Sequence, residues 1–123
     1  MDRRQFCLAS ATVLAVGSAA GVLAHSQTAP SLVIFDSRFA AGRAFAVAAQ
    51  RRGIATVAIR GDVTALWRQR LNGHWARDGG AVAGLSTRAS LLCLEQMARD
   101  HWRQLQSREL LAAGLVSWVI ARG

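Results

Sequence analysis

Short apolar runs alternate with longer amphipathic segments along the chain after residue 30. A continuous apolar run that ends at a polar residue is typical of a strand buried on both faces of a sheet. Runs of this kind, which we expect to be strands, occupy residues 31–36, 54–59 and 81–85. Residues 38–52 and 63–72 instead gather their apolar side chains on one side of a helical wheel, so they are predicted helices. Gly53 supplies a stop for the first and Asn72-Gly73 for the second.

The segment after the third predicted strand has the clearest helical pattern. Its apolar residues fall within about one quarter of the wheel at 100° per residue: Leu91, Leu94, Ala98 and Trp102. Ser86 or Thr87 is the expected N-cap. Glu95 and Arg99 are four positions apart, a favourable spacing for opposite charges on a helix.

Two further segments lie beyond His101. Residues 103–108 alternate polar side chains with Leu105, a pattern that predicts an exposed edge strand. Residues 115–121 are rich in β-branched side chains and contain Trp118, which favours a last strand. The alternative is a C-terminal helix that also includes residues 109–114.

Strands that alternate with helices predict a parallel sheet joined by right-handed crossovers. The 123 residues leave room for one domain, which we place at residues 31–123. The expected fold class is α/β, with a small three-layer or two-layer open, mainly parallel sheet. Its predicted topology is of the Rossmann or flavodoxin-like type, with the first strand placed centrally.

Ligands of such a sheet bind beyond the carboxyl ends of its strands. Three loops are predicted to converge there, at residues 36–38, 60–62 and 84–88. The candidate ligand-binding residues in these loops are Asp36, Ser37, Arg38, Asp62, Ser86, Thr87 and Arg88.

An anion is the ligand that the third loop favours. A helix start offers free backbone N–H groups and the positive end of a dipole. Ser86, Thr87 and Arg88 lie at that start, and Arg38 is expected opposite them. The alternative, which we prefer because capping is so common, is that Ser86 or Thr87 only caps the helix while both arginines are solvated. GxGxxG and GxxxxGK[ST] motifs are absent from the sequence, which disfavours a dinucleotide or a nucleoside triphosphate.

Asp36 and Asp62 each follow a predicted strand, so they are candidates for a carboxylate pair that does acid–base work or holds Mg²⁺. The competing interpretation is that both residues form turns or helix caps. The histidines His25, His74 and His101 lack the spacing of metal ligands, so we expect no metal or cofactor.

Cys93 has two interpretations: a nucleophile, or a partly buried structural thiol, which we prefer because no histidine has a sequence reason to lie near it. Trp67 is expected in the core. His74-Trp75 is either an exposed aromatic patch for a partner or part of the core.

The formal net charge is +8, carried by fifteen arginines and no lysine. Such a charge favours anionic partners in general. For the all-arginine composition we prefer a GC-rich coding bias over a functional explanation. Nucleic acid is not the expected partner, because the arginines are spread along the chain and match no known binding module.

The N-terminal residues are chemically distinct from the rest. Arg3 and Arg4 are followed by Phe6 and by a weakly apolar stretch at residues 9–23. This segment resembles a bacterial twin-arginine signal peptide, and it departs from that pattern at Asp2 and at Leu8, which comes one place late. The resemblance implies a signal-peptide helix, export of a folded domain to the periplasm, and the twin-arginine translocase and signal peptidase as partners.

Residues 22–24 fit the small-x-small rule, so cleavage is expected after Ala24, with residues 1–24 as the signal and 25–30 as a linker. The alternative is an uncleaved membrane anchor, although a spanning helix needs about 20 strongly apolar residues. Cleavage removes Arg3, Arg4 and Asp2, a net loss of one positive charge that leaves the domain near +7.

Two functions are consistent with these sequence features. The first is a non-enzymatic accessory or binding protein of the periplasm, such as a small subunit of a larger exported enzyme, because the sequence contains no recognisable catalytic set. The alternative is a small enzyme or ligand-binding domain that acts on an anionic small molecule at the carboxyl ends of the strands.

Overall fold

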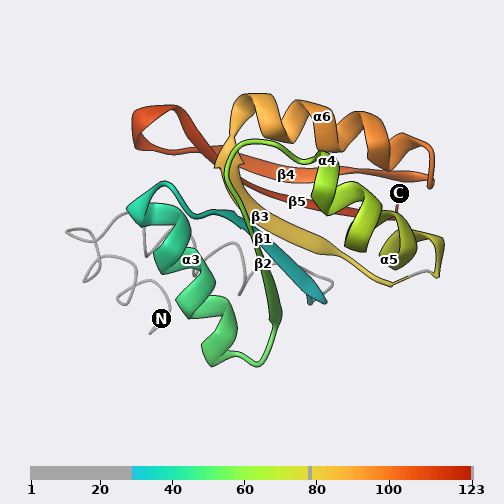
Figure 1. Cartoon of the computed structure of the whole chain (residues 1–123), viewed down its shortest axis with the longest axis horizontal. Coiled ribbons are helices and arrows are strands. Elements are labelled where there is room, and N and C mark those ends of the chain that lie inside the picture. The colour runs from blue at the N-terminus through green and yellow to red at the C-terminus, as the bar shows by residue number, and fades with distance from the viewer. Residues whose placement is uncertain (1–28, 78, 123) are drawn as a thin grey trace, which may run out of the picture.

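The fold is a mixed five-stranded sheet covered by helices on both faces (Figure 1). It is described from a computed structural model, over residues 29–77 and 79–122. The strand order is β2-β1-β3-β5-β4. In chain order the strands are β1 (Leu32–Asp36), β2 (Ala55–Ile59), β3 (Val82–Thr87), β4 (Arg103–Leu110) and β5 (Leu115–Arg122). The signal and most of the linker predicted from the sequence lie outside the described residues.

The helices fall into two layers. Between β1 and β2 lies α3 (Ala40–Arg51). Between β2 and β3 come α4 (Thr64–Leu66), the π-helical turn η2 (Trp67–Leu71) and α5 (Asn72–Ala76). After β3 comes α6 (Arg88–Arg99), and a short 3₁₀ turn, η3 (Ala112–Gly114), joins β4 to β5. Figure 1 shows α6 uppermost and α3 at the lower left.

Each face of the sheet has its own core because strand side chains alternate between the two faces. Leu32 and Ile34 of β1 pack with the helices that follow β2 and β3, whereas Val33 packs with Phe45 and Ala49 of α3. The expected three-layer or two-layer arrangement is therefore a three-layer one. Every helix in the part of the chain that the structure describes is too short or too polar to cross a bilayer.

Most of the predicted elements are confirmed. The strands at residues 31–36, 54–59 and 81–85 correspond to β1, β2 and β3, with β3 continuing to Thr87. The preference for a last strand over a C-terminal helix is also confirmed, as β5. The exposed edge strand is β4, and its side chains are mostly exposed from Gln104 onward.

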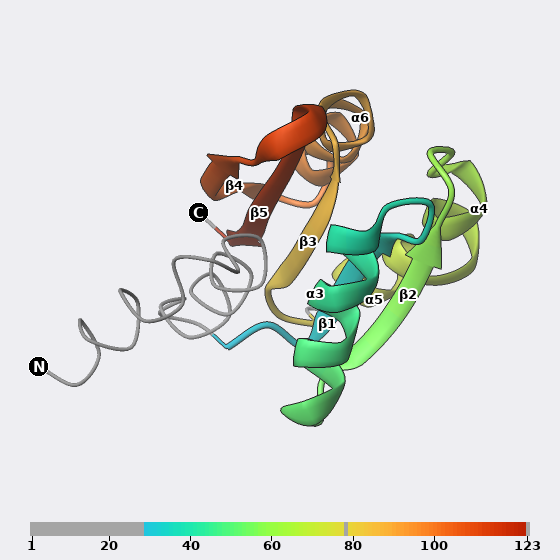
Figure 2. The same cartoon turned by 90° about the vertical axis from the view of Figure 1, so that its left-hand side faces the viewer.

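The sheet is mixed rather than mainly parallel. β1 is parallel to both β2 and β3, whereas β5 is antiparallel to β3 and to β4. The physical reason lies in β5, which is buried on both faces from Leu115 to Ile120 and must therefore lie inside the sheet. The more polar β4 takes the edge, as Figure 2 shows at the end of the sheet opposite β2. The order thus departs from the flavodoxin order 2-1-3-4-5 after the third strand.

Two helix boundaries predicted from the sequence are wrong. The helix that starts near residue 63 continues through Asn72 and Gly73 to Ala76, because the π-helical turn brings Trp75 into the core, where it is 3% exposed. The helix after β3 ends at Arg99, and Trp102 lies beyond it with 86% of its surface exposed. The wheel had placed Trp102 on the buried face with Leu94.

The cross-strand pair of Gly84 and Trp118 fixes how β3 meets β5. The two residues are directly opposite in the antiparallel ladder. A Cβ at Gly84 would overlap the indole of Trp118, so the missing side chain makes room for the ring. Trp118 is fully buried and points its N–H toward the carboxyl end of β3.

Candidate functional site

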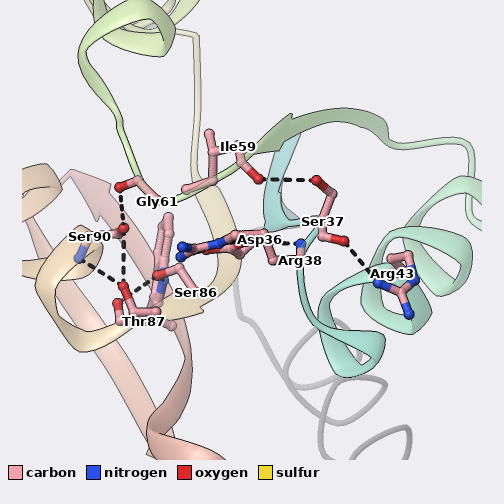
Figure 3. A network of polar contacts seen from close by, with 10 residues as sticks. Asp36, Ser37, Arg38, Arg43, Ile59, Gly61, Ser86, Thr87 and Ser90 are labelled. Atoms are coloured by element: carbon pink, nitrogen blue, oxygen red, sulfur yellow. Dashed lines mark hydrogen bonds and ion pairs between the residues drawn. The ribbon is translucent and has the colours of Figure 1, made fainter.

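The carboxyl ends of the three parallel strands form one polar network, shown in Figure 3. It includes most of the residues that the strand-end rule selects. Its members come from the ends of β1, β2 and β3, the loops after β1 and β2, and the first turns of α3 and α6, with one side chain from β5.

Asp36 is the last residue of β1, and its side chain is buried. Its carboxylate accepts three hydrogen bonds from Arg38. The backbone N–H and Nε donate to Oδ1 over 3.1 and 3.0 Å, and Nη2 donates to Oδ2 over 2.7 Å. These bonds hold the pKa of Asp36 below its ordinary value, against the opposing effect of burial, and the charge of Arg60 adds to the lowering. Asp36 is therefore an ionised carboxylate fixed by a two-pronged guanidinium.

The close approach of α3 secures this strand end. A Cβ at Gly42 would overlap the backbone carbonyl oxygen of Asp36, so only glycine lets the helix come this near. Arg43, on the first turn of α3, donates from Nη1 to the carbonyl of Ser37 over 2.9 Å. Arg43 of α3 and Arg38 of the loop itself thus both hold the loop after β1 in place.

The loop after β2 meets the loop after β1 directly. The carbonyl of Ile59 accepts from the backbone N–H of Ser37 over 2.9 Å and from its hydroxyl over 3.3 Å. Gly61 lies against the guanidinium of Arg38, where an added Cβ would sit 2.9 Å from Nη2. Arg38 therefore lies between Asp36 and the β2 loop.

The third strand end completes the network. Ser86 is fully buried, accepts from Trp118 Nε1 over 3.0 Å and donates to the carbonyl of Thr87. Thr87 caps α6 by accepting from the backbone N–H of Ser90 over 3.3 Å, as the sequence predicted. The hydroxyl of Ser90 donates to the carbonyl of Gly61 over 2.9 Å, which ties α6 to the β2 loop.

Two of the predicted residues stand apart from this network. Asp62 is exposed, and its Oδ1 accepts from the backbone N–H of Thr64 over 2.9 Å, which lowers its pKa. Arg88 is the exposed first residue of α6. Among the described residues, its side chain makes no hydrogen bond or ion pair. The carboxylates of Asp36 and Asp62 are thus engaged with different partners, which is the arrangement of turn and cap residues.

Sequence reasoning missed three members of the network. Ser90 sits three residues after the cap, a position that helix-start rules associate with a return contact. Arg43 is one helical turn into α3. Trp118 had no local signal at all, because it reaches Ser86 only through the antiparallel pairing of β5 with β3.

The edge carries more positive than negative charge. The strand-end loops and the helix starts that follow them contain four arginines, Arg38, Arg43, Arg60 and Arg88, and two aspartates, Asp36 and Asp62, so four positive charges against two leave an excess of two. Backbone N–H groups at the start of α6 add the positive end of a helix dipole. The hydroxyls of Ser86, Thr87 and Ser90 are already committed to structural hydrogen bonds. The arrangement is suited to holding an anion rather than to activating a nucleophile.

The aromatic and thiol residues lie elsewhere. Trp75 is buried and Trp67 half-buried, and both pack against His101 with ring centroids 6.2 and 5.5 Å from it. Cys93 is exposed, so the expectation of a partly buried thiol is wrong. In the part of the chain that the structure describes, no three potential metal ligands come together.

Comparison with known proteins identifies no relative of this chain. No protein-family model, curated protein or solved structure matches this chain.

Proposed function

We propose that this chain is an exported binding protein that holds a small anion, such as a phosphate or carboxylate compound, at the carboxyl ends of β1, β2 and β3. The observation that carries the proposal is the convergence of the three strand-end loops at one edge of the sheet, where arginines outnumber aspartates by two. Parallel strands in the order 2-1-3 support the same location, because ligands of open α/β sheets bind at this edge.

The ligand contacts follow from which groups are still available. Arg38 is held by Asp36 but leaves 40% of its side chain exposed. Arg60 and Arg88 are exposed, and in the described part of the chain neither side chain makes a hydrogen bond. An anion placed at the start of α6 meets Arg88 and the first N–H groups of the helix, with Arg38 and Arg60 on the other side.

A binding role fits better than a catalytic one. A nucleophilic hydroxyl needs a general base within hydrogen-bond reach. Here Ser86 accepts from an indole N–H and Asp36 is saturated by Arg38. Export itself rests on the twin-arginine resemblance of Arg3, Arg4 and Phe6.

Thermal unfolding with inorganic phosphate tests the binding site. At a phosphate concentration about ten times Kd, a single site stabilises the fold by about 1.4 kcal/mol. For a domain of this size we expect a rise in Tm of roughly 5 to 10 °C. Arg88→Ala reduces the rise, whereas Arg52→Ala, an exposed arginine at the far end of α3, leaves it unchanged. An equal rise in both variants would contradict the assignment.

An accessory role beside a larger exported enzyme is a second candidate, favoured by the exposed outer face of α6. Leu92 is 58% exposed there, next to the exposed Cys93. Apolar side chains on an uncovered helix face are typical of protein contacts. Purification from the native periplasm tests it: a stoichiometric partner supports the role, and recovery of the domain alone at its own mass contradicts it.

A further inference from the structure

The guanidinium of Arg38 has two edges that pair with an oxyanion, and the fold uses only one of them. A guanidinium is planar and carries one N–H on Nε and two on each Nη. Nε and Nη2 donate to the two oxygens of Asp36 over 3.0 and 2.7 Å. Both N–H groups of Nη1 and the second one of Nη2 have no partner among the described residues. The edge between Nη1 and Nη2, which we call the free edge of Arg38, is therefore available.

The free edge of Arg38 presents two N–H donors side by side. Two parallel donors match two oxygens bonded to one central atom, as in a carboxylate or a phosphate group. A halide such as chloride accepts at a single centre, so it does not form the same pair of straight hydrogen bonds. This edge therefore selects an anion by shape as well as by charge.

The fold holds the guanidinium of Arg38 in one position. Its partner Asp36 is buried at the end of β1, so the ion pair anchors the guanidinium to the sheet. The Cζ atom also lies 5.2 Å from the centre of the Phe39 ring, a cation–π contact. A side chain that is already fixed loses less conformational entropy when it binds an anion than a freely moving surface arginine does.

Gly61 keeps the free edge open and places it beside the start of α6. A Cβ at Gly61 would lie 2.9 Å from Nη2 and 3.3 Å from Nη1 of Arg38, in contact with both donors. The carbonyl of the same glycine accepts from Ser90 on the first turn of α6. Figure 3 shows the Arg38 side chain reaching from the loop after β1 toward Gly61 and Ser86. Because 40% of this side chain is exposed, an anion can reach the edge from solvent.

We propose that the free edge of Arg38 is the group that recognises the ligand, which must therefore carry a carboxylate or phosphate group with two oxygens for Nη1 and Nη2. This inference rests on the anion site proposed above and names the residue that gives the site its selectivity. Asp36 is a positioning residue, because it acts on the anion only through Arg38. Arg88 and the N–H groups of α6 add attraction for any anion and do not distinguish an oxyanion from a halide.

NMR of the arginine side chains tests the proposal in the unmodified chain. The ¹⁵N-labelled chain is titrated with sodium phosphate, sodium acetate and sodium chloride. We expect the Nη signals of Arg38 to shift and saturate with both oxyanions, at concentrations at least about tenfold below those needed with chloride. Arg43 is the internal control, because its Nη1 already donates to the carbonyl of Ser37.

The outcomes of this titration separate the inference from the anion site itself. Phosphate or acetate that binds at the start of α6 without moving the Nη signals of Arg38 would overturn the role of the free edge and leave the anion site standing. Equal affinity for acetate and chloride would likewise overturn the selection by shape, since the two ions carry the same charge. Absence of binding by both oxyanions would remove the anion site and the inference together.

Arg38→Lys then separates shape from charge, because lysine keeps the positive charge without the paired donors. We expect the affinity for acetate to fall about tenfold and that for chloride to change by less than about twofold. Arg43→Lys is the matched control, with the same substitution beside the same loop, and Arg88→Lys keeps the charge at the start of α6. Both controls should retain the preference for acetate. A retained preference in Arg38→Lys, or its loss in Arg88→Lys, would contradict the assignment.

Asp36→Asn tests the positioning role by a signature that a purely structural role does not predict. In the unmodified chain the ion pair restrains rotation about the Nε–Cζ bond, so Nη1 and Nη2 of Arg38 should give separate signals. In Asp36→Asn we expect these signals to average and the preference for acetate over chloride to weaken. Averaged signals in the unmodified chain, or an unchanged preference in the variant, would show that Asp36 does not position Arg38 for the anion.

Discussion

Asp36 and Arg38 show how two side chains only two positions apart secure a strand end. The carboxylate is buried and accepts three hydrogen bonds from one residue. A buried carboxylate is retained as an ion only when it is paired in this way. Removing either partner is therefore expected to lower the free energy of unfolding more than an ordinary surface substitution does.

The lowered pKa of Asp36 predicts a specific acid sensitivity. Because the folded-state pKa lies below the ordinary value of 3.8, the pair contributes stability that is fully present above about pH 3.8 and lost as pH falls through the lowered pKa. Arg38→Gln removes the largest cause of the lowering. We expect urea unfolding between pH 5 and 2 to show a shallower loss of stability in Arg38→Gln than in the unmodified chain; parallel curves would contradict this.

Trp102 is a residue whose replacement is expected to stabilise the fold. Replacing it by glycine at φ 59° removes a left-handed strain of about 1–2 kcal/mol, partly offset by the larger entropy of glycine in the unfolded chain. Trp102→Gly is expected to raise the free energy of unfolding by about 0.5–1 kcal/mol. Trp102→Ala is the control, since alanine keeps the strain. Equal stability of the two variants in urea would show that the backbone is not strained.

Helices and strands could be predicted from the sequence where their apolar residues form a continuous run or lie on one face. The continuous apolar run of β1 is buried, and so are most of the apolar positions that predicted α3 and α6; Trp102, which the wheel placed with Leu94, is the exception. The helix end at Asn72-Gly73 was misread because two residues that favour helix ends were overridden by burial of Trp75. Local propensity is a weak guide where a large side chain can reach the core.

Gly42 is the residue on which the packing of α3 depends. Alanine there is better for an isolated helix but overlaps the carbonyl of Asp36, so α3 has to move away from β1. We expect Gly42→Ala to lower stability by about 1–3 kcal/mol. Gly73→Ala is the matched control: its Cβ meets only the flexible guanidinium of Arg77, and helix propensity predicts a gain of up to about 1 kcal/mol. Chemical denaturation compares both, and destabilisation of the two variants alike would contradict this account.

At the scale of the whole molecule, the sequence predicted the parallel half of the sheet and the convergence of its loops. It did not predict the antiparallel insertion of β5, because strand order depends on contacts between residues far apart in the chain. Trp118 was consequently absent from the predicted site. Asp36, Ser37, Arg38, Ser86 and Thr87 were found because position at a strand end can be read from a local pattern.

His74 makes the stability of the fold sensitive to acid at the end of the sheet opposite Asp36. The hydroxyl oxygen of Ser31 lies 3.0 Å from His74 Nε2, within hydrogen-bond distance, and this hydroxyl is 2.6 Å from the carbonyl oxygen of Gly79. Desolvation, and then the charges of Arg103, Arg77 and Arg70, lower the pKa of His74 from 6.5. Protonation is therefore harder in the folded state, and stability falls as pH drops below about 6.5.

His74→Gln is expected to remove that loss while keeping a hydrogen-bonding side chain near Ser31. Thermal unfolding at pH 7.5 and 5 measures it: the Tm of the unmodified chain falls more than that of the variant. This window lies above the one governed by Asp36, so the two effects are separable. A larger fall in the variant would contradict the assignment.

Export is tested by location. The resemblance of the N-terminus to a twin-arginine signal predicts that Arg3→Lys with Arg4→Lys retains the chain in the cytoplasm. Fractionation with an antibody against the folded domain measures this. An unchanged location in the double variant would remove the extracytoplasmic part of the proposal and leave the binding edge untouched.

The binding edge is tested most directly by an NMR titration of the ¹⁵N-labelled chain with inorganic phosphate. The account predicts that amide shifts concentrate in three separate stretches of sequence, residues 36–38, 60–62 and 86–90, and saturate with one common Kd. Shifts that are absent at these residues, or that gather around Trp102 and Arg122 instead, would contradict a phosphate-binding role for the carboxyl ends of the parallel strands.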